Sequence, residues 1–451
     1  MDTGEETRSA RVPEKAIPDE EAQARRQRWA WVEPSVWTDR MLAALENGVQ
    51  KGKWFSRIDK VHRKANLASA FREVKRNGGA AGVDHVSVAA IERDLDGELT
   101  RLSEALRTDT WQPQAARRVF IDKPGTREKR PLGIPTVRDR VCEGAVRHVL
   151  EPIFEPVFDG NSFGFRPGRG AKDALRAVDR ELKAGNVYVV DADIKRYFDT
   201  IPHERRLARV SERISDGRVM AMLEALLKRG VLEGRDWQAT ETGTPQGGVI
   251  GPLLANVYLH PLDQAMRRAG YTMIRCADDL VILCVKPEDA AEAQALLRAW
   301  VEEQGLVLHP VKTRIVNLNE PGQGFDFLGY HVERTRRGKL DRWPRRKSLA
   351  KRKTDIRAAM HRANGKSLPD IIATVNRTTR GWYEYFKHSN IQTFPELDGW
   401  IRGRLRAILR KRAGLRGRGR GRDHHRWNNA YFAAMGYFSL TDTRRAASQS
   451  A

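Results

Sequence analysis

Apolar residues follow two periods along the chain, and each period predicts a kind of element. Residues 187–190 form a β-branched run that reads as a buried strand and leads to Asp193. Two more β-prone runs, 271–274 and 280–285, flank an acidic pair at 278–279. The pattern predicts a β-hairpin that carries the acidic pair at its turn, beside the exit of the first strand.

Helical periodicity accounts for much of the remaining chain. Residues 1–34 are an exception, because they are charged and poor in apolar side chains, which predicts a partly disordered N-terminal extension reaching to about residue 50. Apolar residues recur at helical spacing over 35–45, 67–75 and 141–158, and the stretches 211–232 and 287–304 also read as helices.

The acidic residues suggest metal chemistry. Neighbouring residues of an extended chain point to opposite faces, so only one of Asp278 and Asp279 joins a shared site unless the turn rotates them together. Asp193, at the exit of the first strand, supplies another carboxylate. Carboxylates on adjacent strands repel each other, and Mg²⁺ relieves that repulsion while it holds substrate phosphates. The residues therefore indicate nucleotidyl transfer, and a solvated Asp-Asp turn is the alternative interpretation.

Length, charge and cysteine content narrow the class of protein. A chain of 451 residues predicts two or three domains, and 81 Lys and Arg against 58 Asp and Glu, a net charge of +23, favour a nucleic acid partner. A membrane partner is less favoured, because no apolar run approaches the roughly 20 residues that span a bilayer. Three cysteines without a C-x-x-C pair argue against disulfides and structural zinc, and no secretory signal is visible. We expect a soluble, cytoplasmic protein.

Three motifs follow one another in the middle of the chain, D-I-K-R-Y-F-D at 193–199, P-Q-G-G at 245–248 and C-A-D-D at 276–279. With these in order, the chain resembles the group II intron-encoded reverse transcriptases, or maturases. The resemblance implies an α+β right-hand polymerase, with fingers and palm built on an antiparallel sheet, followed by an α-helical thumb. It also implies two Mg²⁺ ions, and it assigns catalysis and metal binding to Asp193, Asp278 and Asp279, with the main-chain carbonyl of Ile194 as a further ligand.

The resemblance divides the chain into domains. It implies an N-terminal extension over 1–50, fingers and palm over 51–335, a helical maturase (X) or thumb domain over 345–412, and a basic nucleic-acid-binding tail over 413–451. Within that tail, the Arg-Gly run at 416–422 reads as a flexible cationic tether. The HNH endonuclease domain of some relatives needs a cysteine framework that this chain lacks.

Five residues are candidates for contact with the incoming nucleotide. By resemblance, Lys123 and Arg130 deliver positive charge to the triphosphate, although a solvated hairpin tip is the alternative. Phe198 stands where the family places the ring that blocks a ribose 2′-hydroxyl, which implies deoxynucleotides; alone, it would read as core. Gln246 has the length to contact sugar and template. Lys312 resembles the lysine near the leaving pyrophosphate, and a solvated lysine at a strand end is the alternative.

Two regions are candidates for contact with RNA. The run N-S-F-G-F-R-P-G-R-G at 161–170 interleaves aromatic rings with arginines, which suits stacking and phosphate contact on a single strand. A packed turn with two surface arginines is the alternative. The segment 371–390 resembles the maturase region that grips structured RNA. The RNA-binding candidates are Arg166 and Arg169 in the first region and Arg380, Trp382 and Tyr385 in the second.

The implied function is RNA-directed DNA polymerisation on an RNA template, with a DNA primer or target and dNTPs, together with binding of group II intron RNA for splicing and retrohoming. Cys276 stands where the family usually has tyrosine beside the primer end, so a splicing maturase with a decayed polymerase is one alternative. A host-adopted reverse transcriptase in repair or phage defence is another. The sequence leaves open whether the protein forms a homodimer.

Overall fold

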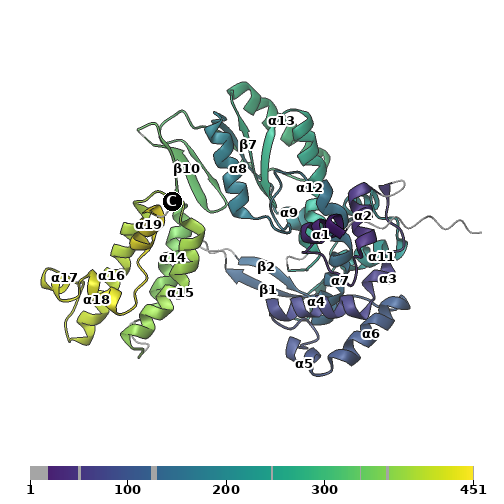
Figure 1. The fold of residues 1–451 in the computed structure, drawn as a ribbon, viewed down its shortest axis with the longest axis horizontal. Coiled ribbons are helices and arrows are strands. Elements are labelled where there is room, and N and C mark those ends of the chain that lie inside the picture. Colours follow the sequence, from purple (N-terminus) through teal and green to yellow (C-terminus); the bar gives the residue numbers. More distant parts are fainter. Residues whose placement is uncertain are drawn as a thin grey trace, which may run out of the picture.

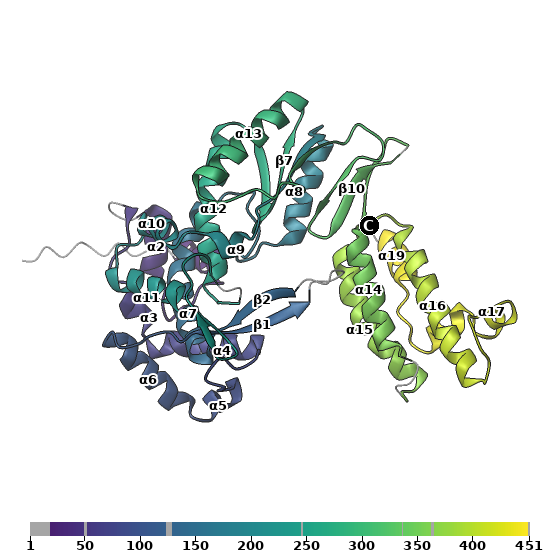
Figure 2. The ribbon, with the colours of Figure 1, turned by 180° about the vertical axis from the view of Figure 1, so that it is seen from behind.

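The computed structural model describes residues 19–48, 52–122, 129–244, 247–335, 337–361 and 365–449. They form an α+β molecule of three lobes, arranged as the fingers, palm and thumb of a right hand (Figure 1, and from behind in Figure 2). This confirms the predicted fold class. Among the described helices, none combines the length and the apolar character needed to cross a bilayer.

The fingers lobe is mostly helical and has a core of its own. Its central helix α7 (Val137–Phe154) is buried along most of its length and packs against α4 (Lys64–Asn77). Apolar side chains from other helices complete this core. These helices are α3 (Ile58–Val61), α5 (Val88–Arg93), α6 (Leu95–Arg107), α10 (His203–Ser211) and α11 (Gly217–Lys228).

A four-stranded sheet in the order β2-β1-β4-β5 forms one edge of the fingers. β1 (Ala116–Asp122) and β2 (Lys129–Ile134) form an antiparallel hairpin. β1 also pairs in parallel with β4 (Val231–Glu233), which is antiparallel to β5 (Asp236–Gln238). The β1–β2 hairpin projects from the fingers toward the thumb, below the palm in Figure 1.

The segment 19–48 packs onto the fingers. Its helix α1 (Asp19–Arg28) falls in the stretch whose composition predicts disorder, whereas α2 (Asp39–Asn47) and the buried Val36 and Trp37 fall where the spacing over 35–45 predicts a helix. The indole Nε1 of Trp37 donates a hydrogen bond of 2.8 Å to the carbonyl of His148 in α7. A few apolar anchors thus hold an otherwise charged segment, and overall composition does not reveal them.

The palm is a four-stranded antiparallel sheet in the order β6-β7-β3-β8, and it is buried on both faces. Successive side chains alternate between the faces, so Val190 and Ile282 pack with α12 and α13, whereas Val189 and Val281 pack with α8. The elements are β3 (Tyr188–Asp193), β6 (Thr272–Cys276), β7 (Asp279–Cys284), β8 (Arg314–Asn317), α8 (Ala171–Lys183), α9 (Tyr197–Thr200), α12 (Gly251–Arg268) and α13 (Pro287–Glu303).

The thumb follows a small antiparallel sheet in the order β11-β10-β9, and the expected domain boundary at 335–345 falls inside this sheet. Buried residues of the thumb helices belong to the same core cluster as the α8 face of the palm sheet, so palm and thumb share one hydrophobic core. The elements are β9 (Gly324–Phe327), β10 (Tyr330–Arg334), β11 (Leu340–Pro344), α14 (Arg346–Ala359), α15 (Leu368–Phe386) and α16 (Thr393–Arg412).

The chain beyond residue 412 differs from the predicted tail. The Arg-Gly run at 416–422 forms a largely exposed loop, after which the chain folds back as α17 (Arg422–Arg426), α18 (Asn429–Ala434) and α19 (Leu440–Gln449). Phe432 and Leu440 are fully buried in the shared palm and thumb core. Buried Asp398 of α16 accepts hydrogen bonds of 3.2 and 2.9 Å from the Leu440 and Thr441 amides, which caps α19. This segment is a packed layer of the thumb.

Candidate active site

The acidic residues of two motifs meet at one end of the palm sheet. Asp193, the last residue of β3, lies directly opposite Asp279, the first residue of β7. Because side chains alternate along a strand, Asp191, Asp193 and Asp279 point to the face that carries Val189 and Val281. Asp278 precedes Asp279 in the hairpin turn. The structure therefore brings together the three carboxylates that the motifs single out.

The hairpin between β6 and β7 turns in two residues, since Cys276 pairs with Asp279. Ala277, the first of the two, has a φ of 62°, a left-handed conformation that residues with a Cβ adopt only at a cost. Close packing accompanies this strained turn. A Cβ at Gly164 would lie 2.3 Å from the Ala277 nitrogen, so only glycine fits there. The 161–170 run thus lies directly against the turn that carries Asp278.

A buried arginine supports the turn from inside the palm. Arg275 is fully buried and makes two hydrogen bonds, of 2.8 and 2.6 Å, to the Asp263 carboxylate on α12. Its Nη1 donates to Asn256 Oδ1 and to the Ala277 carbonyl, each at 3.0 Å. Arg275 is therefore a positioning residue that sequence reasoning missed. The sequence did contain a signal for this role, because Arg275 lies within an otherwise apolar strand, and an arginine buried there requires an acidic partner.

The carboxylates at this end of the sheet disfavour one another's charged form. Burial, with the charges of Asp278 and Asp193 adding to it, raises the pKa of Asp279 to about 6. Burial also raises the pKa of Asp278, again with a contribution from Asp193. Burial raises the pKa of Asp191 to about 7, and neighbouring carboxylates add to the effect. Such mutual repulsion is what a bound cation would relieve.

Two of the predicted cations lie close to these carboxylates. Lys312 Nζ is 2.6 Å from Asp193 Oδ2, although the lysine side chain is 60% exposed. Arg130 lies on β2 of the fingers, and its positive charge acts on Asp278 to lower the pKa of that carboxyl. The fingers hairpin therefore faces the acidic turn. Lys123 lies outside the described residues. An anionic group placed between the lobes would meet positive charge from both of them.

The Asp279 side chain also serves a second turn. Leu328 and Gly329, which join β9 to β10, have φ values of 48° and 83°, as a two-residue type I′ turn requires. Asp279 Oδ2 accepts a hydrogen bond of 3.3 Å from the Leu328 amide, and Tyr385 of α15 donates its hydroxyl to the Leu328 carbonyl at 2.7 Å. Asp279 thus ties the acidic hairpin to the β9–β10 turn and, through Tyr385, to the thumb.

Comparison with known proteins accounts for both the palm and the thumb. A family model described as reverse transcriptase (RNA-dependent DNA polymerase) matches residues 121–332, and one described as the group II intron maturase-specific domain matches residues 349–427. Protein YkfC of Escherichia coli strain K12 is 32% identical over 349 residues, which are 68% of this chain and 86% of YkfC. The chain belongs to the group II intron-encoded reverse transcriptase and maturase family.

Other relatives match over a smaller part of their length. The group II intron-encoded protein LtrA of Lactococcus lactis subsp. cremoris is 41% identical over 199 residues, and the match covers 43% of this chain but only 32% of LtrA. A solved telomerase from Candida albicans, in complex with a fragment of telomeric RNA, matches with a TM-score of 0.41 and 11% identity over 71% of this chain and 64% of that chain.

Reverse transcriptases generally use a divalent metal, and the acidic end of the palm fits one. Asp193 and Asp278 offer hard oxygen ligands, and Mg²⁺ is usually held by one or two carboxylates together with substrate phosphates. Ile194, whose carbonyl was predicted as a ligand, directly follows Asp193 and is buried. Within the described ranges, no group of three or more His, Cys, Asp or Glu side chains is spaced to hold a metal alone.

The predicted sugar-selecting residue has an aromatic neighbour in this family member. Phe198 is half-buried, and its ring meets that of Phe165 edge-on, with 6.2 Å between the centroids. Phe165 has a φ of 55° and is 53% exposed. An exposed ring in a left-handed backbone conformation is unusual, and it extends the aromatic surface from the palm into the 161–170 run.

The P-Q-G-G motif connects the lobes. Gln246 lies outside the described residues, but Gly247 has a φ of 125°, and a Cβ there would lie 2.4 Å from the Gly133 carbonyl on β2. Glu143 of α7 is fully buried and accepts hydrogen bonds from two consecutive amides just after the motif, the second from Ile250 at 3.1 Å. The fingers thereby hold a turn that leads directly into α12 of the palm.

Three predicted RNA-binding residues are instead engaged inside the protein. Arg166 is 7% exposed, pairs with Glu155 at 2.7 Å and donates to the Ser162 carbonyl at 2.6 Å. Trp382 is 5% exposed in the shared core, and Tyr385 binds the Leu328 turn. The burial of Arg166 and Trp382 corrects the expectation of direct RNA contact for these two residues, whereas Tyr385 is partly exposed and its RNA contact remains a prediction.

The spacing along α15 contains the signal for this correction. Val375, Trp382 and Phe386 lie on one face of the helix, four or seven residues apart, and all three are buried. Arg380, on the other face, is exposed, and so is Arg169 in the 161–170 run. Arg169 and Arg380 therefore remain predictions as RNA contacts.

Cys276 occupies the family's tyrosine position as a half-buried thiol. Burial, with the charges of Asp279 and Asp278 adding to it, raises the pKa of this thiol to about 11. Burial raises the pKa of Tyr385 to about 12, with contributions from Cys276 and Asp279, so this thumb tyrosine lies near the thiol. An aromatic side chain is thus present beside the hairpin, but it comes from the thumb.

Proposed function

We propose that this chain is an RNA-directed DNA polymerase that also binds group II intron RNA as a maturase, acting in splicing and retrohoming. The observation that carries the proposal is the convergence of Asp193 and Asp278 at the end of the palm sheet, with Lys312 and Arg130 nearby. Family membership supports the class of reaction and an RNA partner. The cysteine content supports a cytoplasmic location.

Each side chain then has a task in nucleotidyl transfer. Asp193 and Asp278 would hold Mg²⁺, and the Ile194 carbonyl and Asp279 would complete the predicted ligand set. When bound, a pair of such ions stabilises the attacking and leaving oxygens. The two carboxylates also orient the primer end toward the phosphate that it attacks.

The cationic and aromatic side chains act on the nucleotide. Arg130 and Lys123 bind the triphosphate of the incoming dNTP, and Gln246 contacts its sugar and the template. Lys312 pairs with Asp193 in this structure. Once substrate has bound, its ammonium group neutralises or protonates the leaving pyrophosphate. The ring of Phe198 excludes a 2′-hydroxyl by steric clash.

Primer extension on poly(rA) with oligo(dT), dTTP and Mg²⁺ tests the proposal. We expect wild type to extend the primer and Asp278→Asn, which keeps the shape but removes the charge, to lower the rate by about 10³-fold or more. Glu288→Gln, at the exposed start of α13, is the matched control and should behave as wild type. Wild-type rates in Asp278→Asn would overturn the proposal.

A splicing maturase without polymerase activity is the second candidate, and Cys276 is the observation that favours it. If the missing ring has abolished polymerisation, wild type should fail to extend the primer and Cys276→Tyr should restore extension. Intron RNA binding, measured by filter retention, should be equal in wild type, Cys276→Tyr and Asp278→Asn under either candidate, because none of these changes removes a cationic RNA contact.

A further inference from the structure

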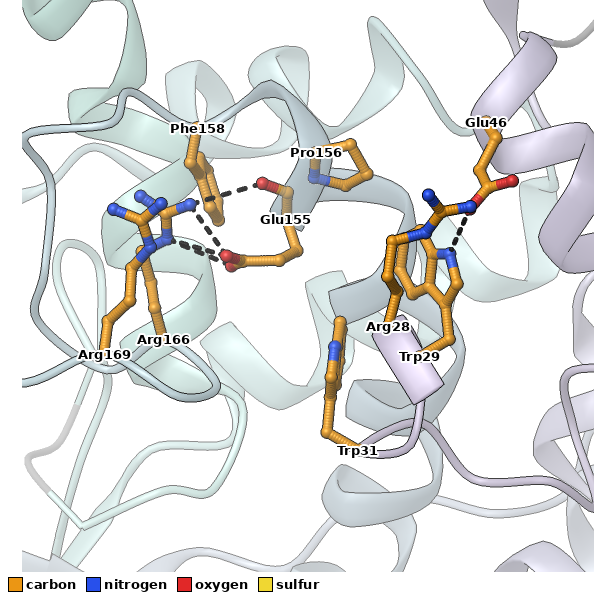
Figure 3. A pocket seen from close by; sticks show the side chains of 9 residues that line it. All are labelled: Arg28, Trp29, Trp31, Glu46, Glu155, Pro156, Phe158, Arg166 and Arg169. Carbon is orange, nitrogen blue, oxygen red and sulfur yellow. Dashed lines mark hydrogen bonds and ion pairs between the residues drawn. The ribbon is translucent and has the colours of Figure 1, made fainter. Parts of the chain in front are cut away.

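A cavity of about 330 Å³ lies between the N-terminal helices and the 161–170 run. Its walls come from α1 and the turn after it, from α2, from the helical turn η2 (Glu155–Val157) and from the loop before α8. Figure 3 shows Trp31 standing between two groups, Arg166 with Arg169 on one side and Arg28 with Trp29 on the other. Polymerisation, as proposed above, uses none of this cavity.

The aromatic wall of the cavity has one fixed and one accessible ring. Trp29 donates its indole N–H to Glu46 at 3.1 Å, which fixes its orientation. Trp31 lies 5.6 Å from Trp29 between ring centroids, at an interplanar angle of 35°, and is 36% exposed. A large apolar ring held at the wall of an open cavity is suited to stacking on a planar ligand.

The charges around the cavity leave one arginine without an acidic partner. Arg28 pairs with Glu46 at 2.9 Å, and Arg166 pairs with Glu155 at 2.7 Å. Arg169 donates to a main-chain carbonyl at 2.7 Å, and no carboxylate of the described residues lies within ion-pair distance of it. Three arginines and two glutamates give the cavity a net positive charge, which favours an anion such as a phosphate.

The cavity is connected to the active site along the 161–170 run. Gly164 touches the Ala277 turn beside Asp278, the exposed ring of Phe165 follows, and Arg169 reaches the cavity five residues after Gly164. A single strand that follows this run away from the active site meets the Phe165 ring, then Arg169, which has no acidic partner among the described residues, and then Trp31. Alternating rings and cations are the usual means of holding unpaired nucleic acid.

We propose that this cavity binds one unpaired nucleotide of a single-stranded RNA, with Trp31 stacked on the base and Arg169 on a neighbouring phosphate. The volume is at the lower end of ligand pockets, which suits one nucleotide, and a duplex has no free base face to offer. The strand is either the unpaired template ahead of the primer or a loop of a structured RNA. The template source rests on the proposed polymerase function, whereas the binding chemistry does not.

Binding of a fluorescently labelled single-stranded oligo(rA) of about 12 nucleotides, followed by anisotropy, tests the cavity directly. Trp31→Ala should weaken binding about tenfold, and Trp31→Phe, which keeps a ring, should stay within about threefold of wild type. Arg169→Gln should reduce the slope of log affinity against log salt by about 1. Equal affinity of Trp31→Ala and wild type, with both folded by circular dichroism, would overturn the proposal.

Primer extension then distinguishes the two sources of the strand. On templates whose unpaired overhang is long, about 12 nucleotides, Trp31→Ala should raise the template KM if the cavity holds the template, and it should leave KM unchanged on overhangs of about 2 nucleotides. Weaker oligo(rA) binding with unchanged KM on both templates assigns the cavity to a structured RNA. A wild type that extends no template contradicts the polymerase proposal, while the binding measurement still decides the cavity.

Discussion

At the scale of single residues, the buried pair Arg275 and Asp263 prepares the turn that carries Asp278. Arg275→Met leaves Asp263 charged and buried without a partner, which should lower the free energy of unfolding by about 3–5 kcal/mol. The double variant Arg275→Met with Asp263→Leu should lose less, because it removes both charges together. Urea unfolding of the single and double variants measures both values.

A surface pair on α13 supplies the control. Arg298 pairs with Glu302, and both side chains are more than half exposed, at 53% and 64%, so Arg298→Met should change the free energy of unfolding by only about 0–1 kcal/mol. The double variant of Arg275 and Asp263 should fold and yet extend primers slowly, because the Ala277 carbonyl has lost its donor. Wild-type extension by that folded double variant would contradict a positioning role for Arg275.

At the scale of elements, the fit between the 161–170 run and the β6–β7 hairpin should control the position of Asp278. Gly164→Ala places a methyl group where the Ala277 nitrogen now lies within 2.3 Å, so the turn must move. A displacement of about 1 Å at reacting groups can cost about 10² in rate, and we expect a loss of that size in the rate of primer extension.

Gly170→Ala, in the same run, is the matched control for Gly164→Ala. A Cβ at Gly170 meets nothing within 4 Å, and the residue has an extended backbone with a φ of −169°. We expect it to extend primers at nearly the wild-type rate in the same assay. If both variants lose the same fraction of the primer-extension rate, the run tolerates no added methyl group anywhere. That result would contradict a particular role for the contact between Gly164 and Ala277.

The contact between α6 and α7 predicts a dependence of stability on pH. Arg138 binds both carboxylate oxygens of Glu98, at 2.7 and 2.8 Å, and these hydrogen bonds lower the pKa of Glu98 from 4.5 to about 2. The folded protein therefore binds fewer protons here than the unfolded chain, so the stabilisation is full above pH 4.5 and is lost as the pH falls toward 2.

Comparison of wild type with Glu98→Gln isolates this contribution. Allowing for solvent screening, we expect wild type to be more stable by about 1 kcal/mol at pH 6 and by distinctly less at pH 3. Urea unfolding at the two pH values, followed by helical circular dichroism, measures the difference. A gap between the two proteins that stays constant from pH 6 to pH 3 would show that the ion pair is not the source.

Local patterns were sufficient for the elements that carry the acids. The β-branched run before Asp193 and the two runs around residues 278–279 predicted β3 and the β6–β7 hairpin, because each depends on neighbours in sequence. The supports of the hairpin depend on distant partners: Arg275 on Asp263, and Gly164 on Ala277. Periodicity contains no information about such pairs, so sequence reasoning missed both.

At the scale of the whole molecule, the C-terminal segment contributes to the core shared by palm and thumb. Leu440 is fully buried, so Leu440→Ala should lower the free energy of unfolding by about 2–5 kcal/mol. Leu415, in the exposed loop, is 45% exposed, and Leu415→Ala should stay within about 0.5 kcal/mol of wild type. Thermal or urea unfolding of the two variants measures the difference. A Leu440→Ala variant as stable as Leu415→Ala would contradict a structural role for this segment.

Composition alone misleads at the C-terminal end of the chain. Residues 413–449 are rich in charge, and an average over such a segment conceals the few apolar side chains that are buried, such as Phe432 and Leu440. Charged side chains on helices need only a narrow apolar stripe to be held against a core. The arginines at 416–422 are exposed, as their composition indicates.

A core that joins the palm to the last helices of the thumb has a consequence for synthesis on the ribosome. The strand that ends at Asp193 is translated long before α15 and α19, whose side chains complete the same apolar cluster. At about 5–20 residues per second, the nascent palm waits many seconds with that face unfinished. A premature stop codon after β11 would thus release a polypeptide that retains Asp193, Asp278 and Asp279 but leaves this apolar face uncovered, so chaperones and proteases would bind it before it could act on dNTPs.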